Sequence, residues 1–268
     1  VDARERTYTI VLPPQASSAV AVPMVIALHG GGGSAAQFES TSLLTGKANA
    51  AGFAVVYPNG TAGAGGLQTW NADGCCGGAV ASNVDDVNFI RLMVADVVAN
   101  HMVDAKRVYA TGHSNGGMLA YRLACDWAGG MAAIAPNAAA LVTSTCTPTR
   151  PVPVLHMHSK LDQNVPIAGG VGVGPSGVSY PSLASATTRW VAANACGPTP
   201  QVIVDAGRLT RTTWAPCSGG ATVQTIVTED GGHAWPGGLP GSIMGDTPST
   251  SLNANDTLLA FFRPFMLP

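Results

Sequence analysis

Short apolar segments that alternate with helix-like segments constrain the fold of this chain more than any other feature. Segments 23–30 and 51–60 are almost continuously apolar, and each ends in a glycine-containing turn. Such runs are typical of strands covered on both faces, since a strand with one wet face alternates apolar and polar residues. By the same criteria we expect further strands at 6–12 (an edge strand), 107–114, 131–140, 152–159 and 222–230, and helices at 85–101, 115–126, 182–195 and 255–266. The alternation predicts an α/β fold with a mostly parallel central sheet and helices on both faces.

Glycine- and proline-rich stretches at 60–80, 165–181 and 231–250 lie within this alternation and are interpreted as loops over one face of the sheet. The sequence contains no internal repeat and no long linker. Residues 1–268 are therefore expected to form a single domain.

The charges of the chain are few and scattered. Thirteen Lys and Arg against fifteen Asp and Glu give a net charge of -2, without the basic patch that a nucleic-acid partner requires. Apolar runs stay shorter than the ~18 residues of a membrane span. We therefore expect neither a nucleic-acid nor a membrane partner.

Six cysteines point to an oxidising compartment, and their spacing to histidines does not suggest a metal. Among the fifteen possible pairings we expect Cys125–Cys146 and Cys196–Cys217, while the adjacent Cys75 and Cys76 either pair with each other or reach elsewhere. The domain is thus predicted to be stapled by disulfides and exported. Because the chain begins at Val1 without a charged and apolar leader, we expect that a signal peptide is absent from this chain.

The motif G-H-S-N-G at 112–116 combines a serine with two closely spaced glycines. It follows a predicted strand and opens a predicted helix, which is the context of the nucleophile turn of α/β-hydrolases. Side chains on the flanking glycines would clash in so tight a corner. We therefore predict Ser114 as a catalytic nucleophile rather than as a solvated turn residue.

A serine nucleophile needs an imidazole base, and in this fold the base comes last in the chain order serine, acid, histidine. His233 lies in EDGGHAWPGG, just past a predicted strand, and is the expected base. His156 and His158 also follow the serine, but they lie inside a buried strand and are interpreted as structural. His113 is expected to support the turn.

The catalytic acid is expected between the serine and the histidine. Asp162 follows the strand 152–159 by three residues and opens a loop, which is the position the fold requires. Asp126, at a helix end, and Asp205, in a weak edge segment, are the alternatives. Asp162 would hold the tautomer of His233 and stabilise its imidazolium form.

Glycines at 29–34 (HGGGGS) follow a buried strand, where this fold forms half of its oxyanion hole. We assign the main-chain N–H of Gly31, with Gly32 as the alternative, and that of Asn115. A phosphate-binding loop is the competing interpretation, but the Lys-Ser or Lys-Thr that should follow it is missing.

Motifs along nearly the whole chain now allow a comparison with a known family. They are LHGGGGSA, TWNADGCCG with VDDVNFI, RVYATGHSNGGMLAYRLAC, PVPVLHMHSKLDQNVP and GGHAWPGG. With these motifs the chain resembles the polyhydroxybutyrate depolymerase and feruloyl esterase family of α/β-hydrolases, close to carbohydrate esterase family 1. The resemblance implies the same triad of Ser114, Asp162 and His233.

The resemblance is incomplete around the acid. Relatives usually have glycine where Ser159 stands and tyrosine where Ile167 stands, and Lys160 is unexpected so close to the acid. This loop borders the pocket, so Lys160 is a candidate substrate contact. Trp70 and Trp235 flank the expected site and would either stack on an acyl group or pack in the core.

The predicted function is that of a secreted serine carboxylesterase that hydrolyses feruloyl-type esters or polyesters through an acyl-enzyme on Ser114, without metal or organic cofactor. Its partner would be a small or polymeric ester substrate. One alternative is an amide hydrolase with the same triad, for instance acting on poly(aspartate), which would favour a positive rim. The other is a non-catalytic binding protein on an esterase scaffold.

Overall fold

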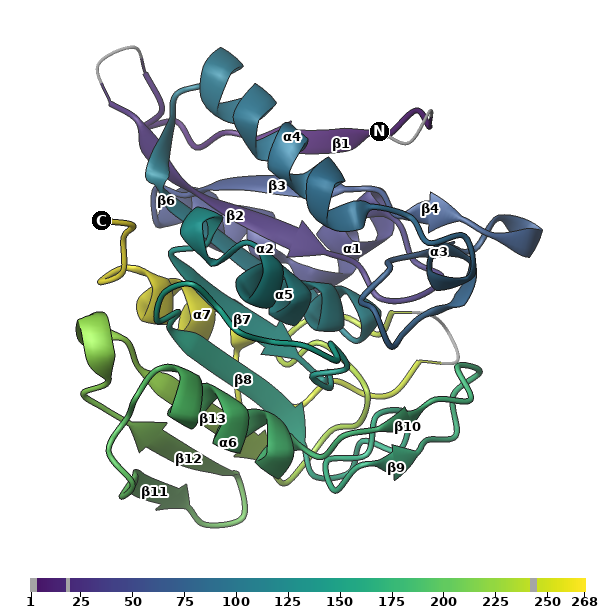
Figure 1. Cartoon of the computed structure of the whole chain (residues 1–268), viewed down its shortest axis with the longest axis vertical. Helices are drawn as coiled ribbons and strands as arrows, with labels where there is room; N and C mark the ends of the chain where they lie inside the picture. Colours follow the sequence, from purple (N-terminus) through teal and green to yellow (C-terminus); the bar gives the residue numbers. More distant parts are fainter. Residues whose placement is uncertain (1–3, 18–19, 242–244) are drawn as a thin grey trace.

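The computed structural model describes residues 4–17, 20–241 and 245–268 of the chain. Its central feature is a nine-stranded sheet with the order β1-β3-β2-β6-β7-β8-β13-β12-β11 (Figure 1). In that order the strands are β1 (Tyr8–Val11), β3 (Ala54–Pro58), β2 (Val22–Leu28), β6 (Val103–His113), β7 (Ala133–Asn137), β8 (Val154–Ser159), β13 (Val223–Thr228), β12 (Leu209–Trp214) and β11 (Gln201–Asp205). The six strands from β3 to β13 pair in parallel, and the antiparallel strands lie at the two ends of the sheet. The predicted mostly parallel sheet is confirmed, with 6–12 as its edge strand.

Helices cover both faces of the sheet, as predicted. One face packs against α4 (Asp86–Asn100), α5 (Asn115–Asp126) and α6 (Leu183–Ala193), and the other against α1 (Ala35–Ser42), α2 (Leu44–Ala50) and α7 (Ala254–Phe262) (Figure 1). From Met24 to Leu28 successive residues of β2 alternate between the two apolar clusters, and all seven residues of the strand are buried. A strand in that position needs apolar residues throughout, which explains its continuous apolar run.

The smaller elements lie in the connections. They are β4 (Thr61–Ala62), η1 (Ala64–Gly66), β5 (Gln68–Thr69), α3 (Gly77–Ala81), η2 (Ala128–Gly130), β9 (Gly170–Val171), β10 (Ser179–Tyr180) and η3 (Ser218–Gly220). The predicted strand 131–140 is shorter than expected, since β7 ends at Asn137. In the described ranges, none of the helices combines the length and the apolar character needed to cross a bilayer.

Three disulfides staple this fold. Cys125–Cys146 and Cys196–Cys217 pair as expected, and Cys75 pairs with its neighbour Cys76, which settles the alternative that the sequence leaves open. The first ties the C-terminal end of α5 to the segment before β8, and the second ties the segment after α6 to the residue before η3.

The loops after the parallel strands converge at the carboxyl edge of the sheet. Segment 29–34 follows β2, Ser114 follows β6, Asp162 follows β8 and His233 follows β13. In open α/β sheets, ligands bind at the carboxyl ends of the strands, so this edge is where catalytic residues are expected to lie.

Candidate active site

Ser114 occupies a sharp corner between β6 and α5. Its backbone angles, φ 54° and ψ -122°, are unusual for a residue with a side chain and mark local strain. A hydrogen bond from Ser114 N–H to Asn137 O at 2.9 Å helps to hold Ser114 in this conformation. A Cβ on Gly116 would lie 2.5 Å from His29 O, and one on Gly112 would lie 2.6 Å from the carbonyl carbon of Gly116. The requirement for both glycines of the motif is therefore confirmed.

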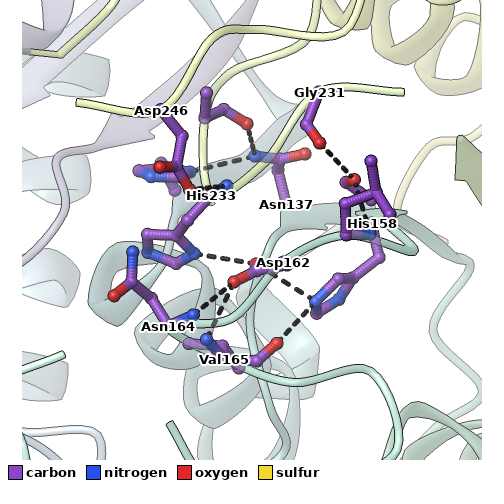
Figure 2. A network of polar contacts seen from close by, with 12 residues as sticks. Asn137, His158, Asp162, Asn164, Val165, Gly231, His233 and Asp246 are labelled. Atoms are coloured by element: carbon purple, nitrogen blue, oxygen red, sulfur yellow. Dashed lines mark hydrogen bonds and ion pairs between the residues drawn. The ribbon is translucent and has the colours of Figure 1, made fainter. Parts of the chain in front are cut away.

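Asp162 and His233 are in direct contact (Figure 2). The Nδ1–H of His233 donates to Asp162 Oδ2 at 2.8 Å, which leaves Nε2 as the ring nitrogen free to take a proton. Burial alone would raise the pKa of the Asp162 carboxyl, but hydrogen bonds from His158 and His233 hold that pKa well below its usual range. Asp162 is therefore ionised at neutral pH, as its expected role requires.

The turn that carries His233 is fastened by two carboxylates. Asp246 Oδ2 accepts from the His233 main-chain N–H at 2.6 Å. Asp230 accepts from the hydroxyl of Ser249 and from the N–H of Thr250. Burial would raise the pKa of Asp230, but these hydrogen bonds lower it to about 2. The two carboxylates had no assigned role in the sequence analysis: Asp230 ends the predicted strand 222–230, and Asp246 lies in the glycine-rich segment 231–250.

His113 and Asn137 support His233 from the other side. Asn137 Nδ2 contacts His113 Nδ1 and donates to Ala234 O, both at 3.0 Å, and the rings of His113 and His233 lie 4.6 Å apart. Burial, together with the neighbouring His233, lowers the pKa of His113 to about 3. His113 is thus neutral and cannot repel the imidazolium that His233 would form.

The main-chain amides beside Ser114 decide between the two glycines proposed for the oxyanion hole. Gly32 N–H donates to Gln68 O at 2.7 Å and is engaged. Within the described part of the chain, the N–H groups of Gly31 and Asn115 have no acceptor of this kind. A Cβ on Gly31 would lie 3.8 Å from Asn115 Cβ, so the two residues are neighbours. Gly31 rather than Gly32 is therefore the candidate partner of Asn115.

Trp70 lies behind this pair of amides. Asn115 Oδ1 accepts from Trp70 N at 2.7 Å and Asn115 Nδ2 donates to Trp70 O at 3.0 Å, while the Trp70 ring donates to His29 O at 2.9 Å. The Trp70 side chain is fully buried. It has no surface with which to touch a substrate, which corrects the expected substrate contact: the second interpretation, a core aromatic, holds.

A buried ion pair anchors the residue that follows Trp70. Asp86 accepts from the N–H of Asn71 at 2.7 Å and pairs with Arg6 at 2.7 Å. The guanidinium of Arg6 in turn lies 3.9 Å from the centre of the Phe89 ring. The neighbouring Asp85 caps the N-terminus of α4. The two adjacent aspartates thus have different roles: Asp85 is a helix cap, and Asp86 makes buried contacts with Asn71 and Arg6. This second role had no signal beyond the presence of two adjacent aspartates.

The two other candidate contacts lie in different surroundings. Trp235 lines the cleft beside Ser114, although its side chain is buried and its ring lies edge-to-face with that of Phe38, with the ring centroids 5.2 Å apart. Lys160 is exposed, forms an ion pair with Glu229 at 2.9 Å, and is not among the residues that line the cleft. The expected contact of Lys160 with the substrate is therefore not supported. Its positive charge, which would have contributed to a positive rim, is paired with the carboxylate of Glu229.

The cleft itself has a volume of about 310 Å³. Its described lining consists of Gly30, Gly31, Gly32, Gly33, Gln37, Phe38, Thr41, His113, Ser114, His233, Ala234, Trp235, Leu239, Gly241 and Gly245. The described lining thus contains no lysine, arginine, aspartate or glutamate. Such a cleft suits an uncharged substrate.

Comparison with known proteins agrees with this geometry. The model of the family described as esterase PHB depolymerase matches residues 6–194. The chain belongs to this family. It is therefore a serine hydrolase of the esterase class.

Individual relatives share about a third of their residues with this chain over the matched regions. Feruloyl esterase B of Piromyces equi is 30% identical over 85% of this chain, and the putative esterase NocK of Nocardia uniformis subsp. tsuyamanensis is 32% identical over 89%. The chain spans 42% of the length of the former and 73% of the latter.

Solved structures support the fold. An acetyl xylan esterase from Aspergillus awamori matches with a TM-score of 0.66 at 17% identity, covering 96% of this chain and 93% of that one. The Bacillus cereus carboxylesterase matches with a TM-score of 0.60 at 12% identity, covering 98% and 96%. At these identities the similarity shows the α/β-hydrolase fold alone, and the predicted fold class is confirmed.

Proposed function

We propose that this family member is a secreted serine carboxylesterase that cleaves uncharged esters, of feruloyl or polyester type, through an acyl-enzyme on Ser114. The observation that carries the proposal is the cleft that Ser114 and His233 both line, with Asp162 hydrogen-bonded to His233 at 2.8 Å. A strained serine, a free imidazole nitrogen and a buried ionised carboxylate are the three parts that nucleophilic acyl transfer needs.

The reaction would proceed in two steps. Ser114 Oγ attacks the ester carbonyl while His233 Nε2 takes the hydroxyl proton, and the imidazolium formed is stabilised by Asp162. The carbonyl oxygen becomes an oxyanion that accepts hydrogen bonds from the Gly31 and Asn115 amides, each worth about 3 kcal/mol at such sites. His233 then protonates the leaving alcohol, and water repeats the attack to release the acid and restore Ser114.

The lining of the cleft supports an uncharged acyl or alcohol group. Phe38 and Trp235 give the cleft an apolar part of its lining, and glycines 30–33 line it beside the serine without side chains. Curated relatives named feruloyl esterases support an aromatic acyl group, and the family's name supports a polyester. A polyanion such as poly(aspartate) would find no positive side chain among the described lining residues, which argues against the amide-hydrolase alternative.

Secretion is supported by the three disulfides, because such bonds persist in oxidising compartments. A catalytically silent binding protein is disfavoured, because binding alone would not require Asp162 to contact His233 in the cleft of Ser114.

The test is a hydrolysis panel with the wild-type protein and Ser114→Ala. The substrates are p-nitrophenyl acetate and butyrate, methyl ferulate, hydroxybutyrate oligomers, an aromatic polyester and poly(aspartate). We expect hydrolysis of the neutral esters by the wild type, none by the variant, and no cleavage of poly(aspartate). Silence of the wild type on every ester, or unchanged activity of Ser114→Ala, would overturn the proposal.

A further inference from the structure

Three buried side chains continue the hydrogen bonding of Asp162 into the core. Tyr121 Oη lies 2.8 Å from His156 Nδ1, His156 Nε2 lies 2.9 Å from His158 Nδ1, and His158 Nε2 lies 3.3 Å from Asp162 Oδ2. All four side chains are at most 4% exposed. The chain of contacts runs from α5, the helix that begins directly after Ser114, to the acid of the proposed triad.

The local structure explains why these groups line up. His156 and His158 are two residues apart on β8, so their side chains emerge on the same face of the sheet. Their rings stack with centroids 5.2 Å apart, and Tyr121 stacks on His156 at 5.8 Å. The histidines thus form a continuous row between α5 and the loop that carries Asp162.

One contact fixes the direction of the hydrogen bonds. His158 Nε2 also lies 2.8 Å from Val165 O (Figure 2), and a carbonyl oxygen can only accept, so this nitrogen carries the proton. In a neutral His158 the other nitrogen, Nδ1, must then accept from His156 Nε2–H. His156 Nδ1 is left to accept from the hydroxyl of Tyr121.

Burial supports the neutral form of this arrangement. It lowers the pKa of His156 well below its usual value, and it raises the pKa of Tyr121, so the former carries no charge and the latter keeps its proton. Each bond in the row therefore points toward the loop of Asp162, and the last proton, on His158 Nε2, is shared between Val165 O at 2.8 Å and Asp162 Oδ2 at 3.3 Å. Bonds that point the same way polarise one another, and the last donor is strengthened by those behind it.

The carboxylate of Asp162 is held at both oxygens by this means. Oδ1 accepts from the N–H groups of Asn164 and Val165 at 2.9 Å each, and Oδ2 is shared by His233 and His158. We propose that Tyr121, His156 and His158 are positioning residues, which form a one-way hydrogen-bond chain that orients the ionised Asp162 for His233. The inference rests on the proposed function, because it takes Asp162 as the acid of the triad.

The direct test of direction is nitrogen NMR of the histidines in the wild-type protein. We expect His156 and His158 to carry their single proton on Nε2, and the Nδ1 proton of His233 to resonate far downfield. A proton on both nitrogens of His158, or on Nδ1 of His156, would overturn the one-way chain. This measurement needs no variant, whereas a truncation such as His158→Ala would leave a hole and an orphaned donor in the core.

The test of function is Tyr121→Phe, which removes one hydroxyl and no carbon from the core. We expect kcat to fall by roughly two- to fivefold with KM unchanged, because the far end of a chain contributes less than a direct bond. The His233 Nδ1 proton should also move in the spectrum. The matched control is Tyr57→Phe: Tyr57 is equally buried, and its hydroxyl contacts Thr45 Oγ1 at 3.0 Å, outside the chain.

Wild-type kcat and an unmoved His233 resonance in Tyr121→Phe would show that the hydroxyl serves packing alone. Equal effects in Tyr57→Phe would show the same. Asp162→Asn separates this failure from failure of the proposed function. If Asp162→Asn retains activity, Asp162 is not the acid and the triad is wrong; if it is inactive while Tyr121→Phe is normal, only the chain is wrong.

Discussion

Replacing Asn115 by alanine tests how the oxyanion hole is held together. The Asn115 side chain makes two hydrogen bonds to the backbone of Trp70, at 2.7 Å and 3.0 Å, and both residues are buried. Alanine removes both bonds and keeps the main-chain N–H of residue 115. It leaves the Trp70 N–H without a partner, while the Trp70 C=O keeps its bond from the Cys76 N–H at 3.1 Å. The same segment holds Gly32 through Gln68 O.

The magnitude follows from one orphaned N–H and one further lost hydrogen bond. A buried donor without a partner costs about 1–3 kcal/mol and a lost hydrogen bond about 0.5–1.5 kcal/mol, so the free energy of unfolding should fall by about 2–4 kcal/mol. At roughly 2–3 °C per kcal/mol for a chain of this size, Tm should fall by about 4–12 °C. The loosened segment also displaces the Gly31 amide, and kcat should fall by about 10- to 100-fold, within the effect of losing one oxyanion donor.

The chain offers a matched control in Asn194→Ala. Asn194 is also buried, and its side chain makes the same pair of bonds to Val152, at 2.9 Å to N and 2.7 Å to O, far along the chain from Ser114. Urea unfolding of both variants should show a stability loss that is at least as large in Asn194→Ala, whereas p-nitrophenyl ester kinetics should show a large kcat loss in Asn115→Ala alone. Equal kcat values in the two variants, compared while both are folded, would refute the reasoning.

Three further changes have expected outcomes. Gly116→Ala should lower Tm and abolish most activity, because its Cβ would lie 2.5 Å from His29 O; a fully active variant with unchanged Tm would contradict the strained turn. Replacing both Cys125 and Cys146 by alanine removes a disulfide between residues 21 positions apart, and the free energy of unfolding measured in urea should fall by about 3 kcal/mol. A loss below about 1 kcal/mol would contradict this expectation. Since the pKa of His113 is lowered to about 3, the unfolded chain takes up a proton below about pH 6.5 that the folded chain does not, so stability falls as pH drops through this window. His113→Gln should reduce this dependence of the free energy of unfolding on pH, measured by urea unfolding from pH 7 to pH 4. An unchanged pH dependence would contradict the lowered pKa of His113.

The parallel sheet was predictable because its strands are buried on both faces. The almost continuous apolar runs of 23–30 and 51–60 show neither the alternation of a half-exposed strand nor the period of an amphipathic helix. The helices α1 and α2 were not predicted, since they are short and α1 carries polar residues on much of its surface. The β11–β12 hairpin was not predicted either. β11 is exposed along its whole length, so its apolar residues do not alternate with polar ones in the way that marks a strand with one buried face.

Site residues were predictable where a turn or a chain order demands them. Ser114 needs its two glycines, and an acid and a histidine must follow in order. Trp70 was harder, because an aromatic residue near a site either lines it or packs behind it, and only the contacts with Asn115 and His29 decide. The role of Tyr121 had no sequence signal, since its partner His156 lies 35 residues further along the chain.

The most direct test of the proposed mechanism is covalent labelling of the wild-type protein with a fluorophosphonate, read by intact mass and peptide mapping. The acyl-transfer mechanism predicts one adduct per chain, on Ser114, with loss of esterase activity in proportion to labelling, and no adduct on Ser114→Ala. An adduct on another residue, or ester hydrolysis that survives complete labelling of Ser114, would contradict it.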